Sequence, residues 1–444
     1  MPVVWTEQRV PLRLIAGMAP DNGTWRAADT LARGSKGGAR GRTVIADATM
    51  LWATFSEGRR PDALASVVLP YLSVACTCAG ARFPCCHVLA LLLLDHAAPF
   101  AENEPPPWAA TRLESAARAT RSTPTLPGDD TRRPAVTAGL DEMARWLGDQ
   151  LDHGLAASAA AGRRPWLDAA DRLTDAYAPD AARELRQMAA ELGSAPQWPE
   201  RLLPRLGRLA LLAQAFHRLD SLPPGEQGDA LAAAGLPPRP GDDRVIDTWL
   251  ALGHRQRVDG GQRAMRTWLR GLSSGRWALL ETFQSARRLE GLCLPTGGLF
   301  DGELAFQPSA WPLAAQPAEA LHLVASLADK PAAARSMRDE GGQDIASAVA
   351  AYAAARAANP WLRLFPALLG GVFAEPAPSG WRLRDRGGRL LPLPPRFGQG
   401  WQLLALAGEQ PLTLFGEYDG ATLTPLGALR DAQWHDLATW KGLL

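Results

Sequence analysis

Metal-type ligands are concentrated in one short segment, and this cluster limits the possible folds more than any other feature of the sequence. Four of the five cysteines lie between positions 76 and 86, and a histidine follows directly. Their spacing is Cys76-x-Cys78, six residues, then Cys85-x-His87. Three thiolates with one imidazole suit tetrahedral zinc better than other common metals. The sequence therefore predicts one structural Zn²⁺ held by Cys76, Cys78, Cys85 and His87.

The residues around the ligands predict how the four donors meet. In an extended chain, residues two apart face the same side, so Cys76 and Cys78 can present both sulfurs together. Pro84 predicts the start of a helix, which places Cys85 and His87 around its first turn, where free backbone N–H groups favour thiolates. An apolar run follows. We expect a strand, a knuckle and a helix held together by the metal.

The order C-x-C, a variable gap and C-x-H resembles the SWIM-type zinc finger. The stretch CTCAGARFPCCHVLALLLL is similar to the bacterial form of that family, in which a phenylalanine and a proline precede the second ligand pair and a leucine-rich helix follows. Further segments, from AGLDEMARWLGDQLDHGLA to GELAFQPSAWPL, resemble the bacterial SWIM zinc finger family in the expected order. The resemblance implies zinc as cofactor and an accessory role beside MoxR-type AAA ATPases and proteins with von Willebrand A domains.

Cys86 departs from this resemblance, because the family usually has a basic or polar residue at that position. Two interpretations stay open for it: a spare thiol, or a competitor of Cys85 for the metal. His96 is a weaker candidate, since it would lie more than two helical turns away. A disulfide cluster is disfavoured, because the cysteine total is odd and the N-terminal segment carries charge inside its apolar stretch, unlike a secretory signal.

Composition limits the possible functions. A chain of 444 residues is long enough for two or three domains, and its net charge of +1 gives no global attraction for nucleic acid. No stretch reaches the roughly 20 apolar residues that cross a bilayer. Of 47 basic residues only three are lysines, which leaves 44 arginines, and with so much alanine this indicates GC-biased coding. We expect a protein of the reducing bacterial cytoplasm with no membrane contact.

The predicted fold class is α+β. We expect a small N-terminal zinc-clasped hairpin and helix module over 1–100, a Pro-rich linker over 101–136, an all-helical domain over 137–272, and a mixed α+β domain over 273–444. In the first part, residues 51–58 and 65–76 are predicted strands joined by a Gly-Arg-Arg-Pro-Asp turn. Residues 31–42 contain four glycines and no acid, which predicts a flexible basic loop.

The basic residues near the ligands are candidates for nucleic-acid contacts, because mobile arginines beside a small zinc fold can reach phosphates. The alternative is a plain surface loop, and it is the favoured interpretation. The candidates are Arg33, Lys36, Arg40, Arg42, Arg59, Arg60 and Arg82.

Apolar residues at spacings of three and four predict about six helices between Thr137 and Leu272, including the segments TWLALGHRQRV and RAMRTWLRGL. Five tryptophans in this region are expected to fill the core. After Arg276 the period changes, and we expect strands at WALLETFQ, GELAFQPSAWPL, GWRLRDRGGRLLPLP, WQLLALAGE and PLTLFGEYDGATLTPLG. Asp344 to Ala358 and Leu362 to Leu369 are predicted helices in the same domain.

The sequence contains neither a phosphate-binding G-x-x-x-x-G-K-[ST] loop nor an H-E-x-x-H motif. The other histidines occur singly and are expected at the surface or at helix ends, and Cys293 is expected to be a core thiol. Four protein ligands close a zinc site to reactive water. We therefore expect no enzyme activity. Two hypotheses follow: an adaptor that binds other proteins, which we favour, or a DNA- or RNA-binding protein that uses the zinc module and its basic loop.

Overall fold

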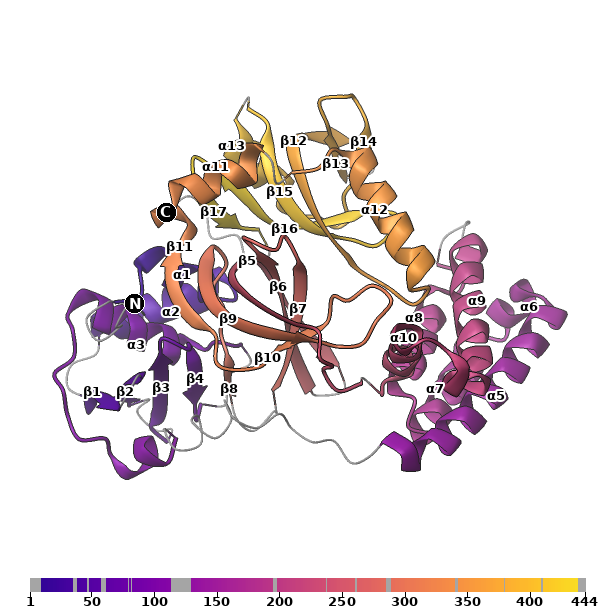
Figure 1. The fold of residues 1–444 in the computed structure, drawn as a ribbon, viewed down its shortest axis with the longest axis horizontal. Helices are drawn as coiled ribbons and strands as arrows, with labels where there is room; N and C mark the ends of the chain where they lie inside the picture. The colour runs from indigo at the N-terminus through magenta and orange to yellow at the C-terminus, as the bar shows by residue number, and fades with distance from the viewer. Residues whose placement is uncertain are drawn as a thin grey trace.

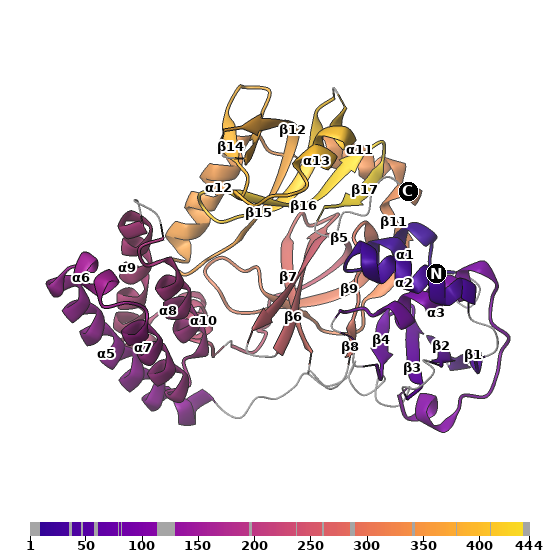
Figure 2. The ribbon, with the colours of Figure 1, turned by 180° about the vertical axis from the view of Figure 1, so that it is seen from behind.

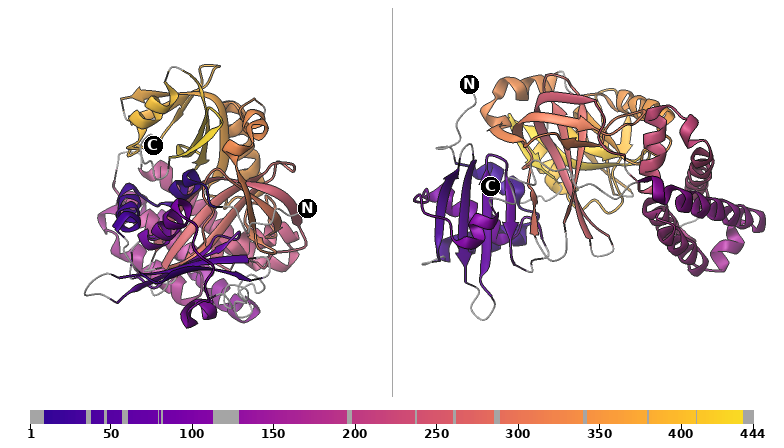
Figure 3. Two further views of the ribbon diagram at one scale, coloured as in Figure 1. Left: turned by 90° about the vertical axis from the view of Figure 1, so that its left-hand side faces the viewer. Right: turned by 60° about the horizontal axis from the view of Figure 1, so that its bottom comes forward.

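The structure is a computed structural model, and it describes residues 9–34, 38–45, 48–56, 61–78, 80, 82–112, 129–194, 198–236, 238–259, 262–284, 289–339, 342–378, 380–408 and 410–437. Three sheets and one bundle of helices make up this part of the chain (Figure 1). The N-terminal module and the helical bundle lie at opposite ends, with two sheets between them. The view from behind and the tilted view agree on this arrangement (Figures 2 and 3). The α+β fold class is confirmed.

The N-terminal module is an antiparallel sheet with helices packed on one face. Its elements are α1 (Leu12–Met18), α2 (Asn22–Gly34), β1 (Arg40–Ile45), β2 (Ala48–Phe55), β3 (Ala63–Leu69), β4 (Ser73–Cys76) and α3 (Cys86–Ala97). The strand order is β1-β2-β3-β4-β8, and β8 (Leu289–Leu292) comes from a distant part of the chain. Residues with high β propensity, such as Val67 and Val74, are buried under α3, which is apolar along most of its length.

Three expectations for this module need correction. The single strand expected over 65–76 is two strands, β3 and β4, joined by a turn. The segment from 31 to 42 is not one flexible loop: Leu31 to Gly34 complete α2, and β1 begins at Arg40. The start of the expected linker is also structured, because the amide of Arg42 donates to Ala101 O (3.1 Å) and Asn103 N donates to Arg42 O (2.9 Å). Its last residues, from Asp129, already belong to a helix.

The helical bundle covers residues 129–234. Its elements are α5 (Asp129–His153), α6 (Leu155–Ala160), α7 (Arg164–Asp175), α8 (Pro179–Glu191), α9 (Trp198–His217), the 3-10 turn η1 (Leu219–Ser221) and α10 (Pro224–Ala234). Prolines in the first turns of α7 and α8 fit there because those amides have no partner within the helix. Trp166 lies fully buried in the core and meets Trp146 edge-on at 5.1 Å between ring centroids. The predicted helices are confirmed for this range.

The prediction that helices continue to Leu272 is wrong. The segments TWLALGHRQRV and RAMRTWLRGL, which were expected to be helical, lie instead in β5 (Arg244–Asp259) and β6 (Gln262–Gly271). These are the central strands of the second sheet. The other strands of this sheet are β7 (Trp277–Gln284), β9 (Gly298–Phe306), β10 (Ala315–Pro317) and β11 (His322–Ser326). Its order is β10-β9-β5-β6-β7, with β11 paired to β9.

The third sheet has the order β14-β13-β12-β15-β16-β17. Its strands are β12 (Phe365–Ala377), β13 (Gly380–Arg384), β14 (Leu390–Pro392), β15 (Leu412–Tyr418), β16 (Leu423–Arg430) and β17 (Gln433–Asp436). The helices near it are α11 (Pro331–Asp339), α12 (Ile345–Ala358) and α13 (Gly400–Ala407), and the 3-10 turn η2 (Leu327–Asp329) precedes α11. The helix predicted from Asp344 is confirmed, and hairpin turns at Asp385 and Asp419 connect β13 with β14 and β15 with β16.

Two elements of this domain differ from expectation. The segment from Trp401 to Glu409 was expected as a strand, but Gly400–Ala407 is helix α13. The helix expected over Leu362 to Leu369 is wrong, since β12 begins at Phe365.

The second and third sheets share a core. Trp268 and Leu252 from the second sheet pack with Phe415 and Leu426 from the third. Two hydrogen bonds cross the contact: Trp268 Nε1 donates to Glu417 Oε1 (3.0 Å), and Trp434 Nε1 donates to Leu252 O (3.0 Å). The shared core and these two hydrogen bonds join the two sheets into one continuous unit. In the part of the chain that the structure describes, every helix is too short or too polar for a bilayer crossing.

Candidate metal centre

The four predicted ligands come from the end of one strand and the beginning of one helix. Cys76 is the last residue of β4, and Cys78 follows after one residue. Cys85 is the N-cap of α3, and His87 lies in its first turn. The helix thus begins two residues after Pro84, close to the predicted position. Because β4 is short and α3 folds back over the sheet, the two ligand pairs face each other.

The donor atoms of these four residues form one compact group. One ligand atom from each lies within 4.8 Å of every other. In a tetrahedral zinc site with metal–sulfur bonds of about 2.3 Å, neighbouring sulfurs are about 3.8 Å apart. Donor atoms that all lie within 4.8 Å of one another are close to this spacing. The Cys78 amide donates toward Cys76 Sγ at 3.5 Å, a contact that stabilises a thiolate. This arrangement is a metal site compatible with zinc.

The cluster rests on the hydrophobic core of the module. Cys76, Cys85 and His87 are buried, and Cys78 is partly exposed. The His87 ring lies 5.4 Å from the ring of Phe55, which ends β2. Phe83, directly before the second ligand pair, is 1% exposed. These aromatic side chains exclude water from the side of the site that faces the sheet and hold the imidazole in place.

Close packing shifts the pKa values of the ligand groups. Hydrogen bonding to Cys76 lowers the pKa of Cys78 far below its usual range. Hydrogen bonds with Cys76 and Cys78, together with burial, raise the pKa of Cys85 well above its usual range. Burial alone would lower the pKa of His87, but hydrogen bonds to Cys76 and Cys78 outweigh it and raise the value to about 12. A divalent cation would replace the protons that these groups share, so metal binding releases protons.

The structure distinguishes Cys85 from its neighbour. Cys86 Sγ and Cys85 Sγ each lie 4.0 Å from His87 Nδ1, but the four mutually close ligands include only Cys85. Cys86 is half-buried at the edge of the module core. His96 lies in the last turn of α3 and its Nδ1 is 3.2 Å from Val10 O, which ties the chain before α1 to the helix.

The four predicted basic residues that the structure describes lie on different elements and have different surroundings. Arg33 pairs with Asp29 on its own helix (2.9 Å), and Arg82 pairs with Asp21 at the start of α2 (2.9 Å). Arg40, on β1, lies over the ring of Phe100. Arg42, also on β1, is half-buried. Lys36, Arg59 and Arg60 lie outside the described residues.

The remaining cysteine and several of the single histidines can also be compared with their expected positions. Cys293 is buried, as expected for a core thiol. His217 and His153 are exposed on helices, as expected, whereas the expectation fails for His254, which is 6% exposed and lies 3.8 Å from Asp436. Sequence reasoning missed β8, which pairs with the ligand strand so that Leu289 opposes Cys76. No local pattern could have revealed this contact, because β8 lies more than 200 residues away.

The geometry defines a Cys₃His metal-binding module joined to a helical bundle and two sheets. A family model described as the SWIM-associated four-helix bundle domain matches residues 131–234. The match coincides with the bundle and does not include the Cys/His cluster. No curated protein and no solved structure matches the chain.

Proposed function

We propose that this protein is a non-catalytic adaptor whose N-terminal module is folded around a single structural Zn²⁺. The observation that carries the proposal is the position of β4. This strand bears Cys76 and lies between β3 of the module and β8, which comes from the C-terminal half. A metal that fixes the end of β4 also fixes the joint between two distant parts of the chain.

The donor set favours a structural role for the metal. Four protein ligands complete a tetrahedron and leave no position for a reactive water. Three thiolates and a neutral imidazole around Zn²⁺ carry a net charge near −1, which the N-terminus of α3 partly offsets, since Cys85 and His87 lie in its first turn. The metal thus contributes folding energy to the module and fixes the end of β4 against the start of α3.

The helical bundle is suited to contact other proteins. It projects from one end of the molecule (Figure 1). It is attached at one side, where Trp361 packs against its core and donates to Arg208 O (3.0 Å), and where Arg363 pairs with Glu184 (3.3 Å). Most of its surface is therefore accessible to a partner. The family resemblance points to a MoxR-type AAA ATPase and a protein with a von Willebrand A domain as those partners.

The nucleic-acid alternative has weaker support. Among its described candidates, Arg33 and Arg82 each have an acidic partner, which lowers the positive charge available for phosphates. The overall charge of +1 adds no long-range attraction. Nucleic-acid binding is therefore the second candidate function, and a direct binding measurement tests it.

A reconstitution with purified components tests the adaptor proposal. The zinc-loaded full chain is mixed with a MoxR-type ATPase and a von Willebrand A protein from the same source, and complexes are measured by size-exclusion chromatography with light scattering. We expect a stoichiometric complex with the wild type and with Cys86→Ser, and none with His87→Ala if the zinc module takes part. Absence of any complex with the wild type rejects the adaptor role in this system.

Fluorescence anisotropy with short single- and double-stranded DNA and RNA at two salt concentrations tests the alternative. Tight binding that weakens steeply with salt, and that reversal of Arg40 and Arg42 to Glu abolishes, would make the module a nucleic-acid binder instead.

A further inference from the structure

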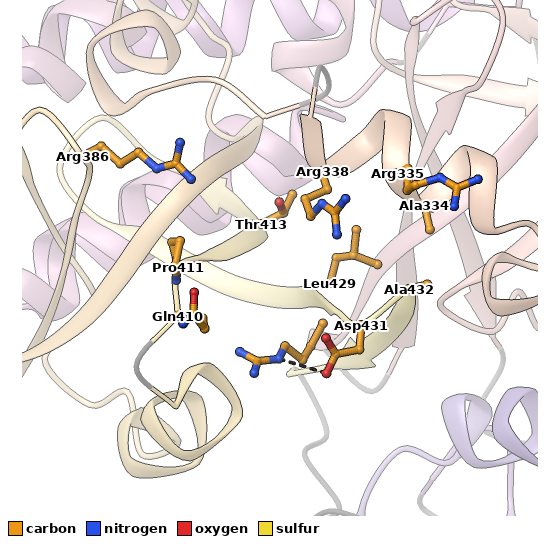
Figure 4. Close-up of a pocket in the computed structure, with 11 residues that line it drawn as sticks. Ala334, Arg335, Arg338, Arg386, Gln410, Pro411, Thr413, Leu429, Asp431 and Ala432 are labelled. Carbon is orange, nitrogen blue, oxygen red and sulfur yellow. Dashed lines mark hydrogen bonds and ion pairs between the residues drawn. The ribbon is translucent and has the colours of Figure 1, made fainter.

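A cavity of about 310 Å³ opens on the C-terminal domain, far in sequence from the metal ligands. It lies between α11, the turn from β13 to β14, and the adjoining ends of β15 and β16 (Figure 4). Its floor is formed by buried side chains, including Ala334, Leu429 and Thr413. A volume of this size lies at the lower end of the range for small-molecule sites.

Arginine is strongly enriched around this cavity. Arginines make up 44 of the 444 residues, or one in ten, because three of the 47 basic residues are lysines. Four of the eleven lining residues are arginines, and only one is acidic. GC-biased coding accounts for the overall abundance of arginine, but it does not account for this local concentration. The four are Arg335, Arg338, Arg386 and Arg430.

Three of these arginines approach the cavity from three separate segments. Arg338 comes from the last turn of α11, Arg386 from the β13–β14 turn, and Arg430 from the end of β16. Figure 4 shows Arg338 and Arg386 on opposite sides of the cavity, whereas the guanidinium of Arg335 points outward. Arginines from three segments thus surround one cavity, and an anion bound there would reduce the repulsion between their charges.

The fold positions two of these side chains. Gly371 has φ of +67°, and a Cβ there would lie 3.0 Å from Arg386 Nε, so the absence of a side chain lets this arginine lie against β12. Arg430 donates to Ala407 O (2.6 Å) and pairs with Asp431 at 3.1 Å. The Arg430 guanidinium is therefore anchored on one side and held by an exposed carboxylate on the other.

The turn beside Arg430 is a tight two-residue hairpin between β16 and β17. Asp431 and Ala432, which both line the cavity, have φ of +48° and +63°. They are the two central residues of this hairpin, in which Arg430 pairs with Gln433, and tight two-residue hairpin turns favour positive φ at both positions. The conformation places both residues at the rim of the cavity.

We propose that this cavity binds small molecules that carry a phosphoryl group. A phosphoryl group offers three terminal oxygens, which three guanidinium groups from different directions can bind together, whereas a carboxylate offers two. The pairs of Arg430 with Asp431 and of Arg338 with Asp339 are exposed, so an anion can exchange with them. Among the described residues that line the cavity none is aromatic, so recognition is directed at the phosphoryl group and not at a base or ring.

Calorimetric titration of the zinc-loaded full chain tests this proposal, at constant ionic strength set with sodium chloride. The probes are inorganic phosphate, phenyl phosphate and succinate. We expect saturable binding of one phosphate or phenyl phosphate per chain, and binding of succinate that is about tenfold weaker or more. Equal affinity for succinate, or the absence of saturable phosphate binding, overturns the proposal.

Charge-reversal variants locate the site. Arg386→Glu and Arg338→Glu should each weaken phosphate binding by about tenfold or more, because each removes a charged fork and adds a repulsive carboxylate. Arg396→Glu is the matched control, since Arg396 is exposed in the same domain and does not line the cavity. Equal losses in all three variants would show a non-specific charge effect and reject the site. Arg386→Lys, which keeps the charge and loses the fork, gives the same test with less disturbance of the fold, and it should bind more weakly than the wild type.

Discussion

The N-terminal module and the helical bundle are both built on buried hydrophobic residues, but they differ in how far each core extends. In the described part of the chain, the buried residues of the bundle core all lie between Val136 and Leu236, and Trp361 is the one outside residue packed against them. The module core instead continues into the second sheet, through residues such as Trp249, Leu269 and Phe300. A region with its own core can fold alone, whereas the module depends on its neighbours and on the metal.

This difference indicates which part of the molecule the metal site stabilises. The bundle needs no clasp, because its helices bury Trp166 and the residues around it without help. The module places its ligands where β4 meets α3, at the junction of local and distant contacts. Loss of the metal should therefore weaken the module and its joint with β8, and leave the bundle intact.

The largest effect is expected from removing a ligand. His87→Ala and Cys78→Ser should each lose the bound zinc and destabilise the module on the order of 5 kcal/mol, because metal binding supplies much of its folding energy. Metal analysis and limited proteolysis measure the loss, and circular dichroism measures the helicity that the bundle retains. Collapse of most of the helical signal would contradict the independence of the bundle.

Cys86→Ser is the matched control for that experiment. The substitution changes a neighbouring thiol that is not among the four mutually close ligands. We expect one zinc per chain and an unfolding temperature close to that of the wild type. If the metal is lost, Cys86 is the ligand in place of Cys85.

A core substitution in the bundle tests the comparison from the other side. Trp166 is fully buried, and Trp166→Ala should destabilise the bundle by about 4 kcal/mol through lost packing and the cavity left behind. Zinc content should stay at one per chain. Thermal unfolding followed by circular dichroism, together with metal analysis, separates the two outcomes; simultaneous loss of zinc would show that the regions unfold together.

The joint between the bundle and the sheets should respond to pH. Asp229 on α10 accepts hydrogen bonds from Ser309 Oγ (2.6 Å), Ala310 N (3.0 Å) and Asn359 Nδ2 (2.7 Å). Burial raises the pKa of Asp229 to about 6 and outweighs the hydrogen bonds that lower it. The folded state therefore holds this proton more tightly than the unfolded state, so the contribution of Asp229 to stability falls as pH rises from about 4 to about 6.

Asp229→Asn isolates this contribution. The stability of the wild type relative to Asp229→Asn should decrease by at most about 3 kcal/mol between pH 4 and pH 7, a limit set by a shift of about two pH units. Urea unfolding at several pH values measures the difference, in which groups common to both proteins cancel. A difference that does not change with pH would show that Asp229 is not held in its protonated form.

The sequence predicted the structure best where the residues that determine a feature lie close together in the chain. The four ligands lie within twelve residues, and their donor types already select a metal, so both the site and the neighbouring strand and helix could be predicted. The helices of the bundle were predictable for a similar reason, because one face of each helix is buried and the other is exposed, which produces the period of 3.6.

The central strands could not be recognised in this way. Trp249 and Ala251 face the core that is shared with the N-terminal module, while Leu250 and Leu252 face the core that is shared with the third sheet. A strand buried on both faces has no alternation, so β5 resembles a helical segment in sequence. The same cause explains β12, where Leu368 and Leu369 lie in different cores.

No local pattern in the sequence predicts the contacts between distant segments. The pairing of β4 with β8 and the convergence of Arg338, Arg386 and Arg430 both depend on the complete fold. In α13 a local signal was present, since Leu403, Leu406 and Ala407 are buried at helical spacing, but the segment also contains residues typical of strands.

The smallest effect is expected at the surface of the module. Arg82 pairs with Asp21, and the two side chains are 62% and 36% exposed, so solvent screens their attraction. Asp21 has a second role, because it accepts hydrogen bonds from the amide (2.7 Å) and hydroxyl (2.9 Å) of Thr24 at the start of α2. Arg82→Ala should therefore cost less than about 1 kcal/mol, while Asp21→Ala should cost about 1 kcal/mol or more through loss of the helix cap. Chemical denaturation of both variants with zinc bound measures the two values. A larger loss for Arg82→Ala than for Asp21→Ala would mean that the arginine supports the metal site itself, and the N-terminus of α3 would then be too weak to offset the charge of the thiolates alone.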